Sequence, residues 1–156
     1  MSHATLADAL APLFRALDGA DPADRALAGR LNAELPLDAP VVAAVRAAAE
    51  AALAAGTLCN REAGGIRFSR PVKPSEDSAG YSVDAVVMED VVGPKHTHTN
   101  GEINLCFAQS GAPRFDGHAA GWVVFPPGST HRPRVDGGRM LILYFLPQGA
   151  IEFHRD

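Results

Sequence analysis

Hydrophobic positions in the first third of the chain recur at helical spacing. Within residues 6–17 the large apolar side chains follow one another at intervals of three and four, which places them on one face of a helix. Ser2 or Thr5 could cap the start of this helix, because a short hydroxyl side chain accepts a hydrogen bond from a free backbone N–H of the first turn. The pattern therefore predicts an amphipathic helix that packs on another element.

Two further helices are predicted before residue 58. Asp21-Pro22 is typical of a helix start, and the helix that follows would bury Leu27 and Leu31. A third helix is predicted to begin near Asp38 and to end at Gly56 as its C-terminal cap. We expect residues 1–57 to form a helical N-terminal segment that packs on the rest of the fold and carries no chemistry of its own.

After residue 80 the hydrophobic pattern changes to that of strands. Asn100-Gly101, Asp116-Gly117 and Asp136-Gly137-Gly138 are turn signals between the apolar runs. Five strands are predicted, over residues 81–92, 102–109, 121–126, 131–135 and 139–147. Short strands with no helix between them predict a sandwich or a barrel.

The segment 58–80 is predicted to connect these two parts of the chain. One strand is predicted within it, over residues 65–74. Its prolines and glycine pairs are expected to keep it out of a regular sheet interior, because proline cannot donate a ladder hydrogen bond.

Composition narrows the class of protein. The 156 residues suffice for one domain, and 47% hydrophobic with 21% charged residues is typical of a globular chain. A net charge of −4 without a basic run argues against nucleic-acid binding, and no apolar stretch is long enough to span a membrane. The N-terminus lacks a secretory signal pattern, and two cysteines do not suggest a disulfide framework. We therefore expect a cytoplasmic protein.

A group of potential metal ligands stands out in the strand region. His96 and His98 are two residues apart, so on an extended chain both imidazoles point to the same face. Glu102 follows after a Thr-Asn-Gly turn, and His131 follows a Pro-Pro-Gly turn. Imidazole and carboxylate are ligands of first-row divalent metals, so we expect one divalent transition metal: Fe, Mn, Ni or Zn. The alternative is a relic barrel that has lost its metal.

These residues resemble the two motifs of the cupin superfamily. The first is His96-Thr97-His98 followed after three residues by Glu102, and the second is the segment 121–131, GWVVFPPGSTH, which ends in His131. The resemblance implies a mainly β fold, a cupin-type small β-barrel (double-stranded β-helix) over residues 58–156, below the N-terminal helical segment. It also implies that the four residues are metal ligands. The chain departs from the family pattern at turn positions only, among them Gly93 and Gly111.

Several nearby side chains are candidates for contact with a substrate. Asn104 shares a strand face with Glu102 by the two-residue period and should look into the barrel. Tyr144 could present its hydroxyl to the same pocket. Arg67 and Arg70 cannot both face one way on a regular strand, but either one could form a forked contact with a substrate carboxylate.

A second resemblance concerns function. The phrases REAGGIRFSRPVKPS, HTHTNGEINLCFA, RFDGHAAGWVVFPPGSTH and GGRMLILYFLPQGAIEF look like the 4-hydroxylaminobenzoate lyase family of nitrobenzoate-degrading bacteria. This resemblance implies an enzyme that converts 4-hydroxylaminobenzoate to 3,4-dihydroxybenzoate and ammonia. The expected partner is a small aromatic acid, and the expected assembly is a homodimer. Glu102 is the catalytic candidate, as a ligand or as a general acid in a metal-free version.

The residues alone leave other reactions open. A site of three histidines and one glutamate can bind O₂ at Fe(II), polarise a substrate oxygen or activate water. One alternative is thus an Fe(II)-dependent cupin dioxygenase acting on a small aromatic or thiol substrate. The other is a non-catalytic cupin that binds a small acid.

Overall fold

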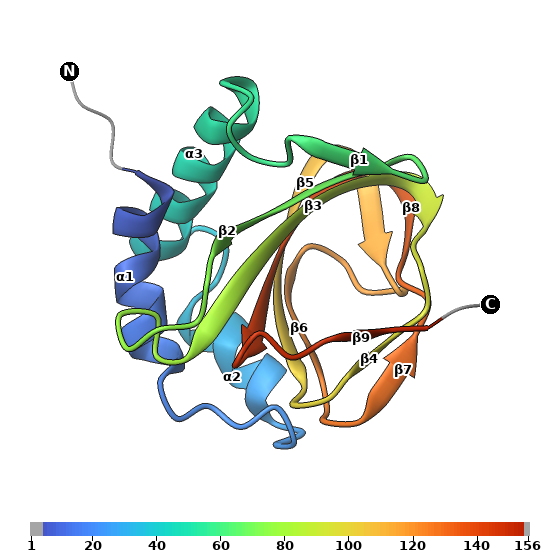
Figure 1. Cartoon of the computed structure of the whole chain (residues 1–156). Helices are drawn as coiled ribbons and strands as arrows, with labels where there is room; N and C mark the ends of the chain where they lie inside the picture. Colours follow the sequence, from blue (N-terminus) through green and yellow to red (C-terminus); the bar gives the residue numbers. More distant parts are fainter. Residues whose placement is uncertain (1–4, 155–156) are drawn as a thin grey trace.

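The computed structural model describes residues 5–154 as a helical layer and two antiparallel sheets (Figure 1). The helices are α1 (Leu6–Leu17), α2 (Leu27–Glu34) and α3 (Pro40–Ala54). The strands are β1 (Arg61–Ala63), β2 (Ile66–Val72), β3 (Tyr81–Val92), β4 (His96–His98), β5 (Glu102–Phe115), β6 (Gly121–Phe125), β7 (Ser129–His131), β8 (Arg134–Pro147) and β9 (Glu152–Phe153). The mainly β fold with N-terminal helices that the sequence predicted is confirmed.

The two sheets differ in size and in position. The larger one has the strand order β1-β2-β3-β8-β5-β6, and the smaller one has the order β7-β4-β9. In Figure 1, α1 and α3 lie side by side on one side of the large sheet, whereas β4, β7 and β9 lie on the side away from them. Within residues 5–154 no helix is long and apolar enough to cross a membrane.

The first and third helices lie close to where the sequence predicted them, although the C-terminal cap of the third is Ala55 and not Gly56. The hydroxyl of Thr5 caps α1 by accepting a hydrogen bond from the backbone N–H of Asp8 at 3.1 Å, while Ser2 lies outside the described residues. Helix α3 starts with Pro40 in its first turn, and Gly56 follows its C-terminal cap with φ +77°. A left-handed residue just after the last turn is favoured as glycine because it has no Cβ to clash.

The predicted start of the second helix at Asp21-Pro22 was wrong. Helix α2 begins at Leu27, although it does bury Leu27 and Leu31. The carboxylates of Asp21 and Asp24 accept hydrogen bonds at 2.9 Å from backbone N–H groups two residues further on. Such local bonds compete with helical ones, so the chain forms turns here before the helix starts.

Two strand predictions also need correction. The turn expected at 136–138 lies inside the continuous strand β8, where the register with β5 shifts and Gly137 and Gly138 have φ +88° and +151°. The glycines therefore bend one long strand and do not separate two strands. Strand β2 lies between β1 and β3 in the large sheet, although it was expected to stay out of a sheet interior. A register irregularity between Ser69 and Val72 accommodates Pro71 there.

Strand β5 separates two hydrophobic cores. Ile103, Leu105 and Phe107 belong to the core that packs against the three helices. Cys106, on the other face, belongs to a second core between the sheets, together with Tyr144. The alternation of side chains along a strand sends neighbouring residues into different environments.

Helix α2 also covers the edge of the large sheet. The side chain of Asn32 donates a hydrogen bond to the carbonyl of Trp122 at 3.0 Å and accepts one from its N–H at 2.9 Å. The indole N–H of Trp122 donates to the carbonyl of Leu35 at 2.8 Å. The exposed edge of β6 is therefore closed by the helical segment.

Candidate metal centre

Two short paired strands place the histidines. In the antiparallel pair β4–β7, His96 lies opposite His131 and His98 lies opposite Ser129. His96 and His98 share one face of β4 because side chains alternate along a strand. Glu102 is the first residue of β5, and the turn that leads to it is closed by a hydrogen bond from the N–H of Gly101 to the carbonyl of His98 at 3.1 Å.

The four predicted ligand residues converge on one point. The Nε2 atoms of His96 and His98 are 2.7 Å apart, and those of His131 and His96 are 3.1 Å apart. An oxygen of Glu102 is in contact with Nε2 of His98 and lies 3.9 Å from Nε2 of His96. The four ligand atoms all lie within 4.8 Å of one another. Three imidazoles and one carboxylate aimed at a single point are the donor set of a divalent transition metal.

The other ring nitrogen of each histidine has an oxygen partner. His96 Nδ1 is 3.1 Å from the carbonyl of Pro94, His98 Nδ1 is 3.1 Å from the hydroxyl of Ser129, and His131 Nδ1 is 2.5 Å from the carboxylate of Asp116. An Nδ1–H that donates to oxygen leaves the lone pair on Nε2, the atom that faces the centre. Such outer partners set the tautomer and the orientation of metal-binding histidines.

Burial decides the charge of the ligands. Desolvation lowers the pKa of His96 to about 4, with a smaller contribution from the neighbouring His98 and His131. Desolvation likewise lowers the pKa of His98 to about 3. Both rings are therefore neutral at neutral pH, the form that binds a metal. Desolvation raises the pKa of Glu102 to about 8, so a carboxylate here needs a neighbouring positive charge.

Unpaired oxygens also fit a cation at this point. Both carboxylate oxygens of Glu102 and the amide oxygen of Asn104 are buried and find no hydrogen-bond partner within residues 5–154. Buried acceptors are normally paired, and a metal ion is one way to compensate a carboxylate that is not. The residues present therefore fit a divalent metal.

A cavity of about 370 Å³ opens beside the cluster. Its walls are mostly apolar, and His96 is the member of the cluster that lines it. The walls comprise Arg61, Ala63, Ile66, Phe68, Ser69, Arg70, Asp84, Val86, Met88, Pro94, His96, Pro133, Tyr144, Ile151 and Phe153. A concave, apolar site with a few polar groups is the usual form of a small-molecule pocket.

The four predicted substrate contacts fall in different places. Arg70 and Tyr144 line the cavity, and the Tyr144 hydroxyl is 4.0 Å from the sulfur of Met88. Arg67 is not part of the wall and projects from the opposite face of β2. Asn104 is fully buried, donates to the carbonyl of Val123 at 3.2 Å and does not line the cavity.

Three residues around the site were missed by the sequence reasoning. Asp116 was interpreted only as part of a turn, yet its carboxylate contacts His131 and accepts the N–H of Arg134 at 2.8 Å. Burial would raise the pKa of Asp116, but these hydrogen bonds outweigh it and lower the pKa. Ser129 precedes His131 by two residues on one strand, a spacing that could have identified it. Arg61 offered no local signal.

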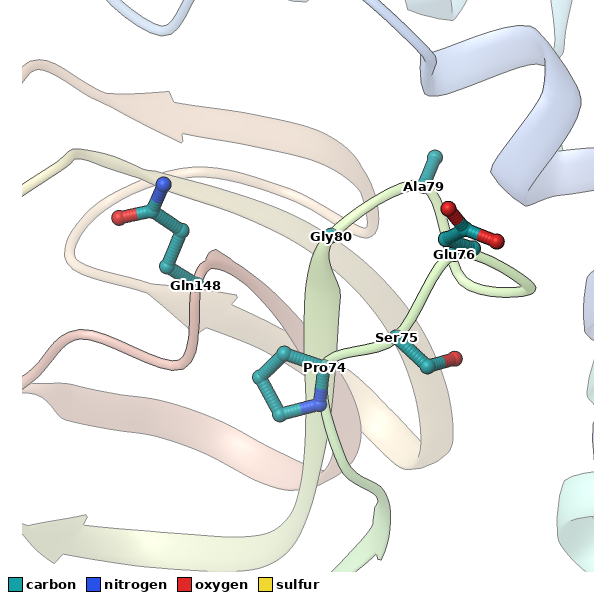
Figure 2. Close-up of a pocket in the computed structure, with 6 residues that line it drawn as sticks. All are labelled: Pro74, Ser75, Glu76, Ala79, Gly80 and Gln148. Atoms are coloured by element: carbon teal, nitrogen blue, oxygen red, sulfur yellow. The ribbon is translucent and has the colours of Figure 1, made fainter.

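A second, shallow hollow lies away from the histidines (Figure 2). It is lined by Pro74, Ser75, Glu76, Ala79, Gly80 and Gln148, and by none of the candidate ligands. In Figure 2 the carboxylate of Glu76 and the amide of Gln148 lie on opposite sides of the start of β3. Its polar groups therefore do not converge, and the metal cluster with its cavity is the better functional candidate.

The chain is similar to proteins of one enzyme family. The family model described as 4-hydroxylaminobenzoate lyase matches residues 8–153. A 4-hydroxylaminobenzoate lyase of Nocardioides sp. is 33% identical over 107 residues, which are 63% of this chain and 63% of that protein. One of Pseudomonas putida is 30% identical over 118 residues, 65% of this chain and 67% of that protein. A cupin-like protein of Thermotoga maritima has a TM-score of 0.45 and 19% identity, covering 59% of this chain and 77% of its own.

Proposed function

Because the chain belongs to the 4-hydroxylaminobenzoate lyase family, we propose that it converts 4-hydroxylaminobenzoate and water to 3,4-dihydroxybenzoate and ammonia. The reaction is redox-neutral: the N–O bond is broken, nitrogen gains two electrons and the ring loses two. One water is consumed overall, so at least one of the two ring oxygens in the product comes from water. No external oxidant or reductant is needed.

The metal cluster supports this proposal. His96, His98, Glu102 and His131 would hold one divalent metal, with Fe, Mn, Ni and Zn all compatible with the donor set. Such an ion would supply Lewis-acid chemistry at an N–O or water oxygen. In a metal-free version of the reaction Glu102 would instead act as a general acid, because desolvation raises its pKa to about 8.

The cavity beside the cluster supports an aromatic substrate. Its mostly apolar walls offer an aromatic and aliphatic surface to a ring, including Phe68 and Met88. His96 is both a wall of the cavity and a member of the cluster, so a bound ring lies next to the metal ligands. This shared residue is the observation on which the proposal rests. The homodimer and the cytoplasmic location stay predictions.

An anaerobic assay tests the proposal. The purified, metal-loaded protein is expected to turn over 4-hydroxylaminobenzoate without O₂, with one ammonia released per 3,4-dihydroxybenzoate and solvent ¹⁸O incorporated into the ring. A dioxygenase would instead require O₂, since its product must contain oxygen from O₂. A strict requirement for O₂, or ring label from ¹⁸O₂ alone, would refute the lyase. Binding of aryl acids without any turnover would favour a non-catalytic cupin.

A further inference from the structure

Two arginines from neighbouring strands reach the cavity, but one of them is already paired. Arg70 donates from Nε to one oxygen of Asp84 at 2.6 Å and from Nη2 to the other at 3.1 Å. It also donates to the carbonyl of Gly149 at 3.4 Å. The charge of Arg70 is thus matched by Asp84, which lines the same cavity. A substrate carboxylate near this pair would meet a positive and a negative group together.

Arg61 on β1 is in a different position. Its guanidinium carbon lies 6.0 Å from the centre of the Phe68 ring, and within residues 5–154 it forms no salt bridge. It lies directly opposite Phe68 in the β1–β2 pair. The ring supports the planar guanidinium while leaving its N–H donors available to an anion.

The remaining polar side chains that line the cavity have partners within the protein. The hydroxyl of Ser69 accepts a hydrogen bond from the N–H of Cys59 at 2.9 Å, and the hydroxyl of Tyr144 lies 4.0 Å from the sulfur of Met88. Both nitrogens of His96 are engaged, one by Pro94 and one in the cluster. With Arg70 and Asp84 cancelling, Arg61 is the one unmatched positive charge that lines the cavity within residues 5–154, in a protein whose net charge is −4. That charge suits a single carboxylate.

We propose that Arg61 binds the carboxylate of the aromatic substrate, and that it makes the site select aryl acids over neutral aryl compounds. The inference rests on the proposed function for the identity of the acid. It replaces the sequence-based choice between Arg67 and Arg70. In this proposal Arg70 has a different role: it neutralises the charge of Asp84, so that Asp84 does not repel the substrate carboxylate. Arg61 is then a substrate-binding residue that takes no part in bond breaking.

The test compares an acid with its neutral amide. KM and kcat are measured for 4-hydroxylaminobenzoate and 4-hydroxylaminobenzamide with the wild type, Arg61→Gln, Arg61→Lys and the control Arg67→Gln. We expect Arg61→Gln to raise KM for the acid by about tenfold or more, with kcat within about twofold and KM for the amide unchanged. Arg61→Lys should restore part of the affinity, and Arg67→Gln should match the wild type.

A binding measurement without turnover separates the two proposals. Calorimetry measures 4-aminobenzoate and 4-aminobenzamide binding to the wild type and to Arg61→Gln. If the wild type prefers the acid and loses that preference with Arg61→Gln but releases no ammonia from 4-hydroxylaminobenzoate, the lyase proposal fails and the Arg61 inference stands. If the wild type shows no preference for the acid, or Arg61→Gln keeps it, the inference is overturned whatever the turnover.

Discussion

The two faces of β5 show how this chain separates stability from chemistry. Ile103, Leu105 and Phe107 alternate with Glu102 and Asn104 along one strand, and all five are fully buried. The apolar face packs against the helices, whereas the polar face holds three of the four buried side-chain oxygens without a hydrogen-bond partner within residues 5–154. Unpaired buried acceptors cost free energy, so the polar face depends on the packing of the apolar face unless a cation is bound.

The largest effect on stability is expected from the apolar face. Leu105→Ala should lower the free energy of unfolding by about 2–5 kcal/mol, because the fully buried leucine leaves a cavity in the helix–sheet core. Denaturant titration measures this loss. Val92→Ala is the control, since Val92 is 48% exposed and should change stability by less than about 0.5 kcal/mol. Folded Leu105→Ala protein should still bind metal; if it does not, the two faces are not independent.

The opposite result is expected from the polar face. His96→Ala should weaken metal binding by about 100-fold or more, because it removes one of four converging ligands. Elemental analysis after dialysis against a chelator measures the loss. His118→Ala is the matched control, since His118 is exposed and lies outside the cluster. Equal metal content in the two variants would contradict the ligand assignment.

A smaller effect on the metal is expected from the partner of His131. Asp116→Asn should reduce metal affinity by about 10- to 100-fold, because an amide no longer enforces the His131 tautomer that presents Nε2 to the centre. Competition with a chromogenic chelator gives the affinity. Asp136→Asn removes a carboxylate paired with Arg134 on the surface and should leave the affinity unchanged. An unchanged metal affinity in Asp116→Asn would mean that Asp116 does not position His131 and serves only in its turn.

The smallest effect is expected from replacing one of two glycines that have nearly the same backbone φ angle. Gly101 and Gly117 have φ +86° and +84°, so alanine is strained by about 1 kcal/mol at either position. A Cβ on Gly101 would lie 2.4 Å from Cβ of Pro22, whereas one on Gly117 would meet nothing within 4 Å. Gly101→Ala should therefore destabilise the protein by roughly 1 kcal/mol more than Gly117→Ala, measured by thermal unfolding. Equal losses would mean that the turn containing Pro22 moves aside freely.

The sequence by itself determined the features that depend on neighbours along the chain. The period of α1 and its cap at Thr5 were predictable because a helix contacts its own residues three and four positions away. The pair His96 and His98 was predictable because alternation along a strand is a local property. Glu102 and His131 were candidates from their residue types and the turns before them, and the motif resemblance implied that all four residues are ligands. The structure brings the four together.

Only the tertiary structure decided what these residues meet. The turn at Asp116 reaches His131 across 15 positions, and Arg70 reaches Asp84 across 14, so no local pattern signals either contact. The three-residue strand β1, which brings Arg61 to the cavity, forms only because β2 pairs with it. Hydrogen bonds and charge pairs between distant segments depend on strand register and on how the sheets face each other, and these arise from packing of the whole chain.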